Sequence, residues 1–439
     1  MLKKFKMAIK EHRLLKTIIS YILKYLQPQK KYLISYNKLD YVFGTKELLK
    51  NNNKYLTLSD KNKKEKITIV FIIWMVEMWN SLRAVYERAC EYPLFNVYIL
   101  AQPHMSDVKL QKGQNPAFNY LSILYGEDKV INAKKNGEWY DIKNLMPDYV
   151  FYTYPYEYHY YDFYKSSYVS NFAKVCLIQY GYTFQIGILF YVAYNFDFSK
   201  NVAIQFVANE TIKRNLVKLY KKKFDYPKIS NSGYPLFDLI KKETTDNRTP
   251  CILWTPRWTS PDQKFNMQSS FLKYEKEFIK FASEHPFVKI IIRPHPRLFE
   301  NFLSKGIMTK QEIEDFKNKC TLIPNLSLDE NPDYMPSVNK ATIIVSDYTA
   351  LLAEYFIKEK PVIYCDCNRG FTKESFIMDS SFYHANNWNE ISKCINSLIN
   401  GEDALKQKRK ELLGKFIPNT HMKSSDKILE FVKEDYFGK

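Results

Sequence analysis

The chain has 439 residues, too many for one small core, so we expect two domains. The chain carries a net charge of +18, and two-thirds of it (+12) lies in residues 1–66, where 17 Lys or Arg stand against 5 Asp or Glu. A nucleic-acid binder instead spreads its basic residues along a contact face, so we expect no nucleic-acid partner. The seven cysteines are odd in number and scattered, which favours free thiols over disulfides. We expect no metal site, since the one close pair, Cys365 and Cys367, has no histidine cluster beside it.

Residues 1–65 form a basic arm with helical spacing of apolar residues in its first part, for example at Leu15, Ile19, Ile22 and Leu26. The arm lacks the uninterrupted apolar run of about 20 residues that crosses a bilayer. It also lacks the small-residue cleavage site of a signal peptide. Residues 1–31 therefore suit an interfacial helix on an anionic membrane. A solvated helix that packs on the body of the protein is the alternative.

Residues 66–240 alternate short buried strands with helices. Residues 66–74 read as a β-branched strand, 77–92 as a helix and 95–103 as the next strand. Further strand-like runs lie at 147–155, 174–181, 201–210 and 228–238. Strand, helix and strand at this spacing indicate βαβ units, hence a parallel sheet.

Residues 241–250 are polar and read as a linker. A second set of strands then follows at 251–256, 288–296, 320–325, 341–348 and 361–365, within a domain that ends near residue 387. Residues 388–439 read as polar helices. Two such α/β sets predict two doubly wound Rossmann-like domains that face each other across a cleft, with ligands at the carboxyl ends of the strands.

Basic side chains follow two strands of the second domain. Arg293 and His295 leave a turn stiffened by prolines, and Arg257 follows residues 251–255 in the same way. Arg holds an oxyanion bidentately, and His titrates near neutral pH. A basic surface turn explains each motif singly, but their convergence favours an anionic ligand.

A third strand end reads Ser346, Asp347, Tyr348 and Thr349 before a helix expected over 350–359. A helix start of this kind suits phosphate, although the same residues are ordinary helix caps. We expect Asp347 to brace the turn. Glu354, one turn into the helix, suits a ribose hydroxyl pair, and an exposed helix glutamate is the alternative.

In order, the stretches "GYPLFD", "ILWTPRWT", "IIIRPHP" and "VSDYTALLAEYFIKEKPVIY" resemble the motifs of the CDP-glycerol glycerophosphotransferase family, over about residues 145–367. The resemblance implies a GT-B architecture and a transferase that moves glycerol phosphate from CDP-glycerol to a hydroxyl acceptor in cell-surface polymer synthesis, releasing CMP. It implies that Arg293 and His295 contact the donor pyrophosphate, that the turn at 346–349 cradles it, and that Glu354 faces the ribose.

The implied partners are a nucleotide-activated donor and a polyol, sugar or lipid-linked acceptor, with no cofactor beyond the donor. The implied location is cytoplasmic, on the inner face of the cell membrane. The family's Gly-x-Pro-x-x-Asp turn matches Gly233, Pro235 and Asp238, where structural support and ligand contact are both open.

The chain departs from the family where a His-Gly pair with the supposed general base is expected. Tyr180 and Gly181 stand there, and tyrosine, with a pKa of about 10, is a poor base at neutral pH. Glu157 and His159, in the tyrosine-rich stretch just before, are other candidates for the base. The departure also motivates the alternative of a GT-B glycosyltransferase that uses a nucleotide-sugar.

Overall fold

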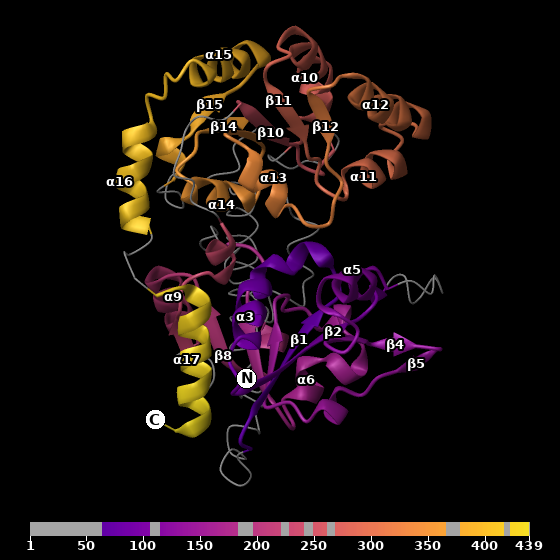
Figure 1. The fold of residues 1–439 in the computed structure, drawn as a ribbon, viewed down its shortest axis with the longest axis vertical. Helices are drawn as coiled ribbons and strands as arrows, with labels where there is room; N and C mark the ends of the chain where they lie inside the picture. Colours follow the sequence, from indigo (N-terminus) through magenta and orange to yellow (C-terminus); the bar gives the residue numbers. More distant parts are fainter. Residues whose placement is uncertain are drawn as a thin grey trace, which may run out of the picture.

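The computed structural model describes residues 64–105, 115–182, 196–220, 228–240, 249–260, 268–365, 378–416 and 422–438. These residues form two lobes, each built on a parallel sheet (Figure 1). The expectations for the arm at residues 1–63, for linker residues 241–248 and for Cys367 lie outside this described part.

The N-terminal lobe holds a seven-stranded sheet in the order β3-β2-β1-β6-β7-β8-β9, in which every pair is parallel. Its inner strand β1 is buried along its whole length, as the continuous β-branched run predicts. A small hairpin, β4 and β5, stands apart from this sheet. The strand bounds are β1 Ile67–Ile73, β2 Phe95–Ala101, β3 Val130–Asn132, β4 Lys134–Lys135, β5 Glu138–Trp139, β6 Tyr149–Tyr152, β7 Lys174–Ile178, β8 Val202–Val207 and β9 Lys228–Asn231.

The C-terminal lobe holds a six-stranded sheet in the order β12-β11-β10-β13-β14-β15, again with parallel pairs. In both lobes the chain winds outward in one direction, returns to the middle, and winds outward in the other. This order is that of doubly wound nucleotide-binding sheets, so the expected pair of Rossmann-like domains is confirmed. The bounds are β10 Cys251–Thr255, β11 Lys289–Ile292, β12 Leu326–Leu328, β13 Ile343–Ser346, β14 Val362–Cys365 and β15 Tyr383–Ala385.

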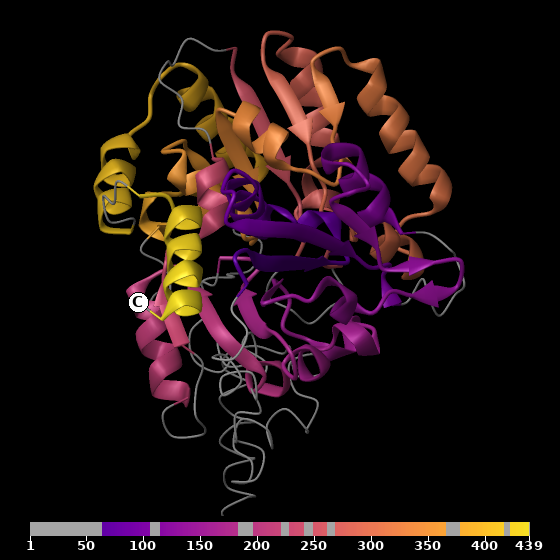
Figure 2. The same ribbon diagram turned by 60° about the horizontal axis from the view of Figure 1, so that its bottom comes forward.

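The helices cover the faces of the sheets (Figures 1 and 2). Those of the N-terminal lobe are α3 Asn80–Cys90, α5 Pro116–Tyr125, α6 Ser166–Val169, α8 Phe196–Ser199 and α9 Glu210–Tyr220. Those that follow are α10 Phe271–Glu284, α11 Leu298–Ser304, α12 Lys310–Leu322, α13 Met335–Lys340, α14 Leu351–Ile357, α15 Trp388–Ile399, α16 Lys406–Phe416 and α17 Ser424–Phe437.

The last helix returns to the N-terminal lobe. Helix α17 packs against α3, beside the pink and purple elements in both views (Figures 1 and 2). The side chain of Asp435 is only 2% exposed and pairs with Lys174 at the start of β7, with 2.6 Å between the carboxylate and Nζ, and also with Lys228. The predicted tail of 388–439 is therefore helical but divided, because α15 covers the second sheet while α17 belongs to the first lobe.

One predicted strand is wrong. The structure continues α12 to Leu322, and the strand of this region is β12 at Leu326–Leu328 instead of 320–325. The buried residues Ile313, Phe316 and Cys320 follow helical spacing, which the prediction overlooked when it read the apolar end of this helix as a strand.

Candidate functional site

The strand order of the C-terminal sheet reverses between β10 and β13, which is where such sheets bind ligands. Thr255 and Ser346 end these two strands, and their buried hydroxyl groups are 2.6 Å apart in a hydrogen bond. The Ser346 hydroxyl is thus engaged inside the protein. The Thr349 hydroxyl is also used within the protein, because its oxygen accepts from the backbone N–H of Leu351 at 3.4 Å.

Asp347 braces this crevice, as expected. Its Oδ2 atom accepts from the backbone N–H of Arg257 at 2.7 Å and of Ser270 at 2.8 Å. Burial raises the pKa of the carboxyl to about 6, and these N–H groups act in the opposite direction. The aspartate therefore ties the turn after β13 to the turn after β10.

Arg257 lies at the same crevice. Its Nη1 atom donates to the Tyr348 carbonyl at 2.8 Å, and the guanidinium stands 5.5 Å from the centre of the Tyr348 ring. Its Nε atom is buried without a hydrogen-bond partner in the described part of the chain. Burial lowers the pKa of this arginine, so the charge is held in a poorly solvated place where an anion would stabilise it.

Arg293 is buried and fixed by a loop that the sequence analysis did not single out. Its Nη1 atom is 2.6 Å from Asp329 Oδ2, and its Nη2 atom donates to the Asn331 carbonyl at 2.6 Å. The arginine is thus oriented, and one neighbouring carboxylate partly balances its charge.

His295 lies close enough to these arginines to feel their charges. Its side chain reaches solvent, yet the protein around it and the charges of Arg257, Arg297 and Arg293 lower its pKa to about 4. Its Nδ1 atom accepts from the backbone N–H of Arg297 at 3.2 Å, so the neutral ring carries its proton on Nε2. A neutral imidazole donor amid three guanidinium groups is an arrangement suited to a phosphate or diphosphate.

The N-terminal lobe meets this crevice at Tyr180 and Gly181. A Cβ atom on Gly181 would lie 3.7 Å from the Ala350 Cβ atom, beside the start of α14. Tyr180 keeps 44% of its surface exposed, but partial burial raises its pKa, and the nearby Arg257 acts in the opposite direction. The position where the family has its supposed base thus lies near Arg257, and the raised pKa keeps the Tyr180 hydroxyl protonated, so it cannot accept a proton at neutral pH.

An aromatic cluster extends from Tyr180 into the N-terminal lobe. The Tyr154 ring lies 5.4 Å from Tyr180 and 4.9 Å from His159, and His159 stacks on Trp74 at 4.5 Å. Burial, followed by the nearby His104, lowers the pKa of His159 to about 4. The other candidate base, Glu157, is engaged by Ser166, whose backbone N–H donates to it at 3.0 Å.

Glu354 is buried, so the alternative of an exposed helix glutamate is wrong. Its Oε1 atom accepts from the Tyr334 hydroxyl at 3.1 Å, and its Oε2 atom is buried without a hydrogen-bond partner among the described residues. Burial raises the pKa of the carboxyl to about 8. A buried carboxyl with an unsatisfied oxygen is costly unless a ligand completes it.

The Gly-x-Pro-x-x-Asp turn supports the fold. Gly233 has a φ of +88°, and a Cβ atom there would collide with the Ser424 side chain. The Asp238 carboxylate accepts from the backbone N–H groups of Ser424 and Ser425 at 3.1 and 2.8 Å. The turn thereby anchors the start of α17 to the N-terminal lobe.

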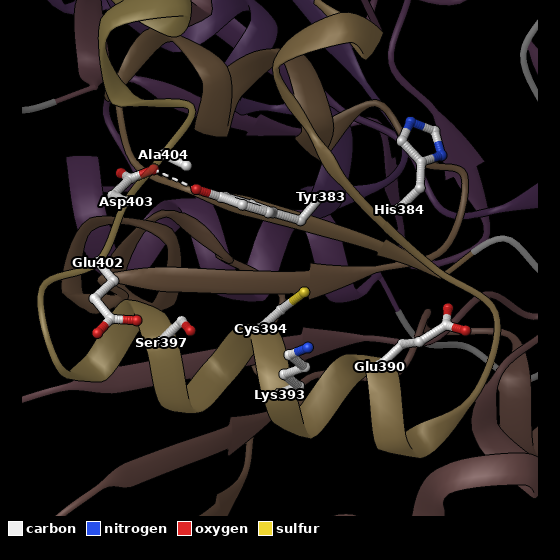
Figure 3. Close-up of a pocket in the computed structure, with 9 residues that line it drawn as sticks. All are labelled: Tyr383, His384, Glu390, Lys393, Cys394, Ser397, Glu402, Asp403 and Ala404. Atoms are coloured by element: carbon white, nitrogen blue, oxygen red, sulfur yellow. Dashed lines mark hydrogen bonds between the residues drawn. The ribbon is translucent and has the colours of Figure 1, made fainter.

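A pocket of about 730 Å³ lies elsewhere on the C-terminal lobe, between β15 and α15 (Figure 3). The Tyr383 hydroxyl donates to Asp403 across one end of this hollow, at 2.8 Å. None of the predicted site residues lines it. This pocket is thus separate from the arginine cluster, and the strand ends remain the better candidate site. The pocket is lined by Tyr383, His384, Glu390, Lys393, Cys394, Ser397, Glu402, Asp403 and Ala404.

The described residues also bear on metal binding and on membrane insertion. They contain no cluster of three or more His, Cys, Asp or Glu side chains placed to hold a metal ion. None of the helices in this part of the chain has the length and apolar character needed to cross a membrane.

The two facing Rossmann-like lobes, with a cationic crevice in the second, define a GT-B-type protein. The family described as CDP-Glycerol:Poly(glycerophosphate) glycerophosphotransferase matches residues 195–434, and the chain belongs to this family.

Similar proteins agree with this placement. The minor teichoic acid biosynthesis protein GgaB of Bacillus subtilis (strain 168) is 23% identical over 223 residues, which are 46% of this chain and 22% of GgaB. The chain thus matches about a fifth of that relative's length. The wall teichoic acid polymerase TagF has the same fold, with a TM-score of 0.54 and 14% identity over 88% of this chain and 93% of that one. A UDP-GlcNAc 2-epimerase from Neisseria meningitidis also shares the fold, with a TM-score of 0.51 and 13% identity over 84% and 100% of the two chains.

Sequence reasoning missed the partners that hold the candidate residues. These partners follow β12 and are Asp329, Asn331 and Tyr334. Because the strand was predicted at residues 320–325, the residues after its true end were not considered. Arg297 belongs to the same motif as His295 and could have been singled out from the sequence. Its guanidinium lies 5.3 Å from the centre of the Trp258 ring, and it forms no ion pair among the described residues.

Proposed function

We propose that the protein transfers glycerol phosphate, or a similar polyol phosphate, from a CDP-activated donor to a hydroxyl acceptor in the synthesis of a cell-surface polymer. The observation that carries the proposal is the set of guanidinium groups around His295 at the switch point of the second sheet. Membership of the glycerophosphotransferase family supports CDP-glycerol as the donor.

In the proposed reaction the acceptor oxygen attacks the β-phosphorus of the donor. The bond from this phosphorus to the bridging oxygen breaks, and CMP leaves with the electron pair. Arg257, Arg293 and the Nε2–H group of His295 would bind the diphosphate and stabilise the charge that develops. The rest of the barrier reduction comes from positioning, since phosphoryl transfer asks little covalent chemistry of a protein.

The turn at residues 346–349 would shape the crevice more than contact the phosphates. Its hydroxyl and carboxylate groups already make internal hydrogen bonds. Glu354 would take up the ribose hydroxyl pair through its unsatisfied Oε2 atom. We propose no cofactor beyond the donor.

The acceptor would approach along the aromatic cluster of Trp74, Tyr154, His159 and Tyr180, where rings and hydroxyl groups suit a polyol, a sugar or the end of a lipid-linked chain. We propose that His159 takes the proton of the acceptor hydroxyl. Its low pKa keeps the ring neutral, and a bound diphosphate would raise that pKa by adding negative charge.

A panel of donors tests the proposed function. We expect CMP to be released from CDP-glycerol in the presence of a polyol or glycerol-phosphate acceptor. Release of UDP from UDP-sugars, with CDP-glycerol left intact, would instead establish the glycosyltransferase alternative.

We also propose that residues 1–31 bind an anionic membrane surface, which would place the protein on the inner face of the cell membrane. The support is the sequence alone, because these residues lie outside the described part. A variant that lacks them should float less with anionic vesicles and keep its activity on a soluble acceptor. Unchanged vesicle binding would contradict this proposal.

A further inference from the structure

The loop after β12 touches both side chains that we propose to hold the donor. Asp329 and Asn331 bind the Arg293 guanidinium, and the Tyr334 hydroxyl binds Glu354 at 3.1 Å. Asn331 in turn donates from its backbone and side-chain nitrogens to Asp329 Oδ1, each at 3.0 Å. The conformation of residues 329–335 therefore sets where the guanidinium and the Glu354 carboxyl stand.

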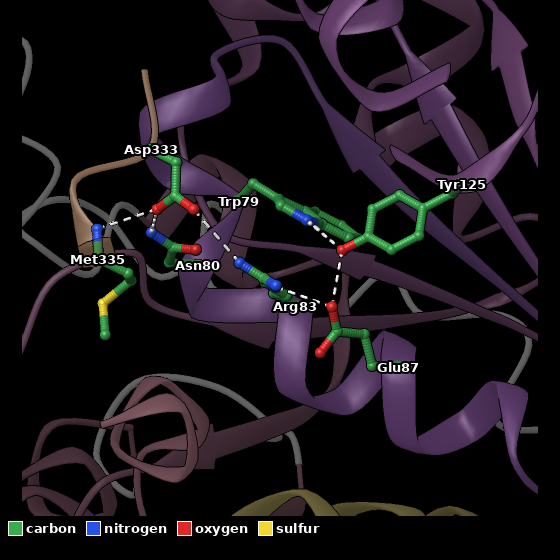
Figure 4. A network of polar contacts seen from close by, with 7 residues as sticks. All are labelled: Trp79, Asn80, Arg83, Glu87, Tyr125, Asp333 and Met335. Carbon is green, nitrogen blue, oxygen red and sulfur yellow. Dashed lines mark hydrogen bonds and ion pairs between the residues drawn. The ribbon is translucent and has the colours of Figure 1, made fainter. Parts of the chain in front are cut away.

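The same loop is held by the N-terminal lobe (Figure 4). Asp333 Oδ1 accepts from Asn80 Nδ2 at 3.0 Å, and its Oδ2 atom lies 3.3 Å from Arg83 Nη1. Asn80 and Arg83 stand in the first turn of α3. Asp333 also accepts from the backbone N–H of Met335 at 3.0 Å, which fixes the loop at the start of α13.

The donors on α3 are themselves fixed. Arg83 Nε donates to Glu87 at 2.8 Å, and the Tyr125 hydroxyl donates to the same carboxylate at 2.9 Å. Trp79 Nε1 donates to that hydroxyl at 3.2 Å. Figure 4 shows these side chains in one continuous network that runs to Asp333 and, through it, to Asn80 and Met335.

The contacts are partly buried. Asn80 is 3% exposed, and the side chains of Asp333 and Arg83 are 18% and 30% exposed. A hollow of about 410 Å³ lies beside the loop and is lined from both lobes, by Tyr120 of α5 and by Asp329, Asn331 and Asp333. An ion pair in such a place is screened less than one on an open surface.

We infer that Asn80 and Arg83 are positioning residues for the donor site of the other lobe: through Asp333 they fix the 329–335 loop, which orients Arg293 and Glu354. The role of this site in donor binding rests on the proposed function. The dependence of the loop on α3 rests on the contacts alone. The affinity for the donor therefore depends on the contact of the N-terminal lobe with this loop.

The test compares Arg83→Ala with Arg88→Ala in the full-length protein. Arg88 stands on the same helix with a similar exposure, but it pairs with Asp426 of α17, away from the loop. We expect Arg83→Ala to weaken CDP binding, measured by calorimetry, by about 5-fold, the low end of ordinary coupling between sites. Arg83→Lys, which keeps the charge, should recover most of the loss, and Arg88→Ala should bind CDP like the wild type.

Hydrogen exchange provides a measurement that needs no donor. In Arg83→Ala the amides of Asn331 and Met335 should exchange faster, and in Arg88→Ala they should not. Unchanged exchange of this loop in Arg83→Ala overturns the inference, as does unchanged CDP affinity in a protein that binds CDP. A wild type that binds no CDP would overturn the proposed donor instead, while the exchange rates would still decide the positioning role.

Discussion

Replacing Glu354 with Gln should make the protein more stable and a poorer binder of its donor. The carboxyl has a pKa of about 8 in the folded protein against an ordinary value of 4.5. Below about pH 4.5 both states are protonated and the shift has no effect. As the pH rises towards 8 the unfolded state loses its proton first, so the folded state loses stability over this range.

At pH 7 this difference opposes folding by about 3 kcal/mol. Gln does not titrate, so this penalty is absent in the variant. Its side-chain oxygen can still accept from the Tyr334 hydroxyl. The variant should therefore be more stable than the wild type at pH 7 by roughly 1 to 3 kcal/mol, and its stability should vary less between pH 5 and 8. A ribose hydroxyl that donates to Oε2 binds the ionised carboxylate, a form that Gln cannot adopt, so CDP affinity should fall about 10-fold.

Thermal unfolding at several pH values and calorimetry with CDP measure the two effects on the same samples. Glu314→Gln, at an exposed position of α12, is the control and should change neither. If the stability of Glu354→Gln depends on pH as that of the wild type does, the raised pKa assigned to the Glu354 carboxyl is refuted. A stabilised variant with full CDP affinity would refute the ribose role alone.

Three further results are expected. His295→Ala should lower turnover at least about 10-fold, as for the loss of one oxyanion donor, while the distant His384→Ala should not; equal turnover in both would remove His295 from the site. Arg293→Met leaves Asp329 buried without its cation and should lower the free energy of unfolding by about 3 kcal/mol. Adding Asp329→Asn to this variant should restore part of the loss. An unchanged free energy of unfolding in a urea titration would contradict the pairing. Gly233→Ala should cost about 1 to 3 kcal/mol through its positive φ and the collision with α17, and an unchanged thermal midpoint would show that the turn tolerates a side chain.

The strands that were predicted well are those buried on both faces. The runs of β1, β10 and β13 are continuous and apolar because helices cover both sides of a parallel sheet, so each run predicts its strand with little ambiguity. The short strand β15 was missed because it lies at an edge of the sheet, where only the last of its three residues is fully buried, which leaves a weak signal.

The candidate site was predictable in part. Prolines and arginines after buried strands indicated the candidate site, because the carboxyl ends of parallel strands meet at one edge. The partners of those arginines were not predictable, since Arg293 and Asp329 are 36 positions apart and meet through the fold. The burial of Glu354 was missed for the same reason, because Tyr334 and the loop that cover it come from another connection of the sheet.

The measurement that tests the account most directly follows the phosphorus of CDP-glycerol by ³¹P NMR, with and without a glycerol-phosphate acceptor. We predict that the diphosphate signals give way to those of CMP and a new phosphodiester in equal amounts, only with the acceptor and not in an Arg257→Met variant. Persistence of intact CDP-glycerol with the wild-type protein, or CMP formed without any phosphodiester, would contradict the proposed transfer.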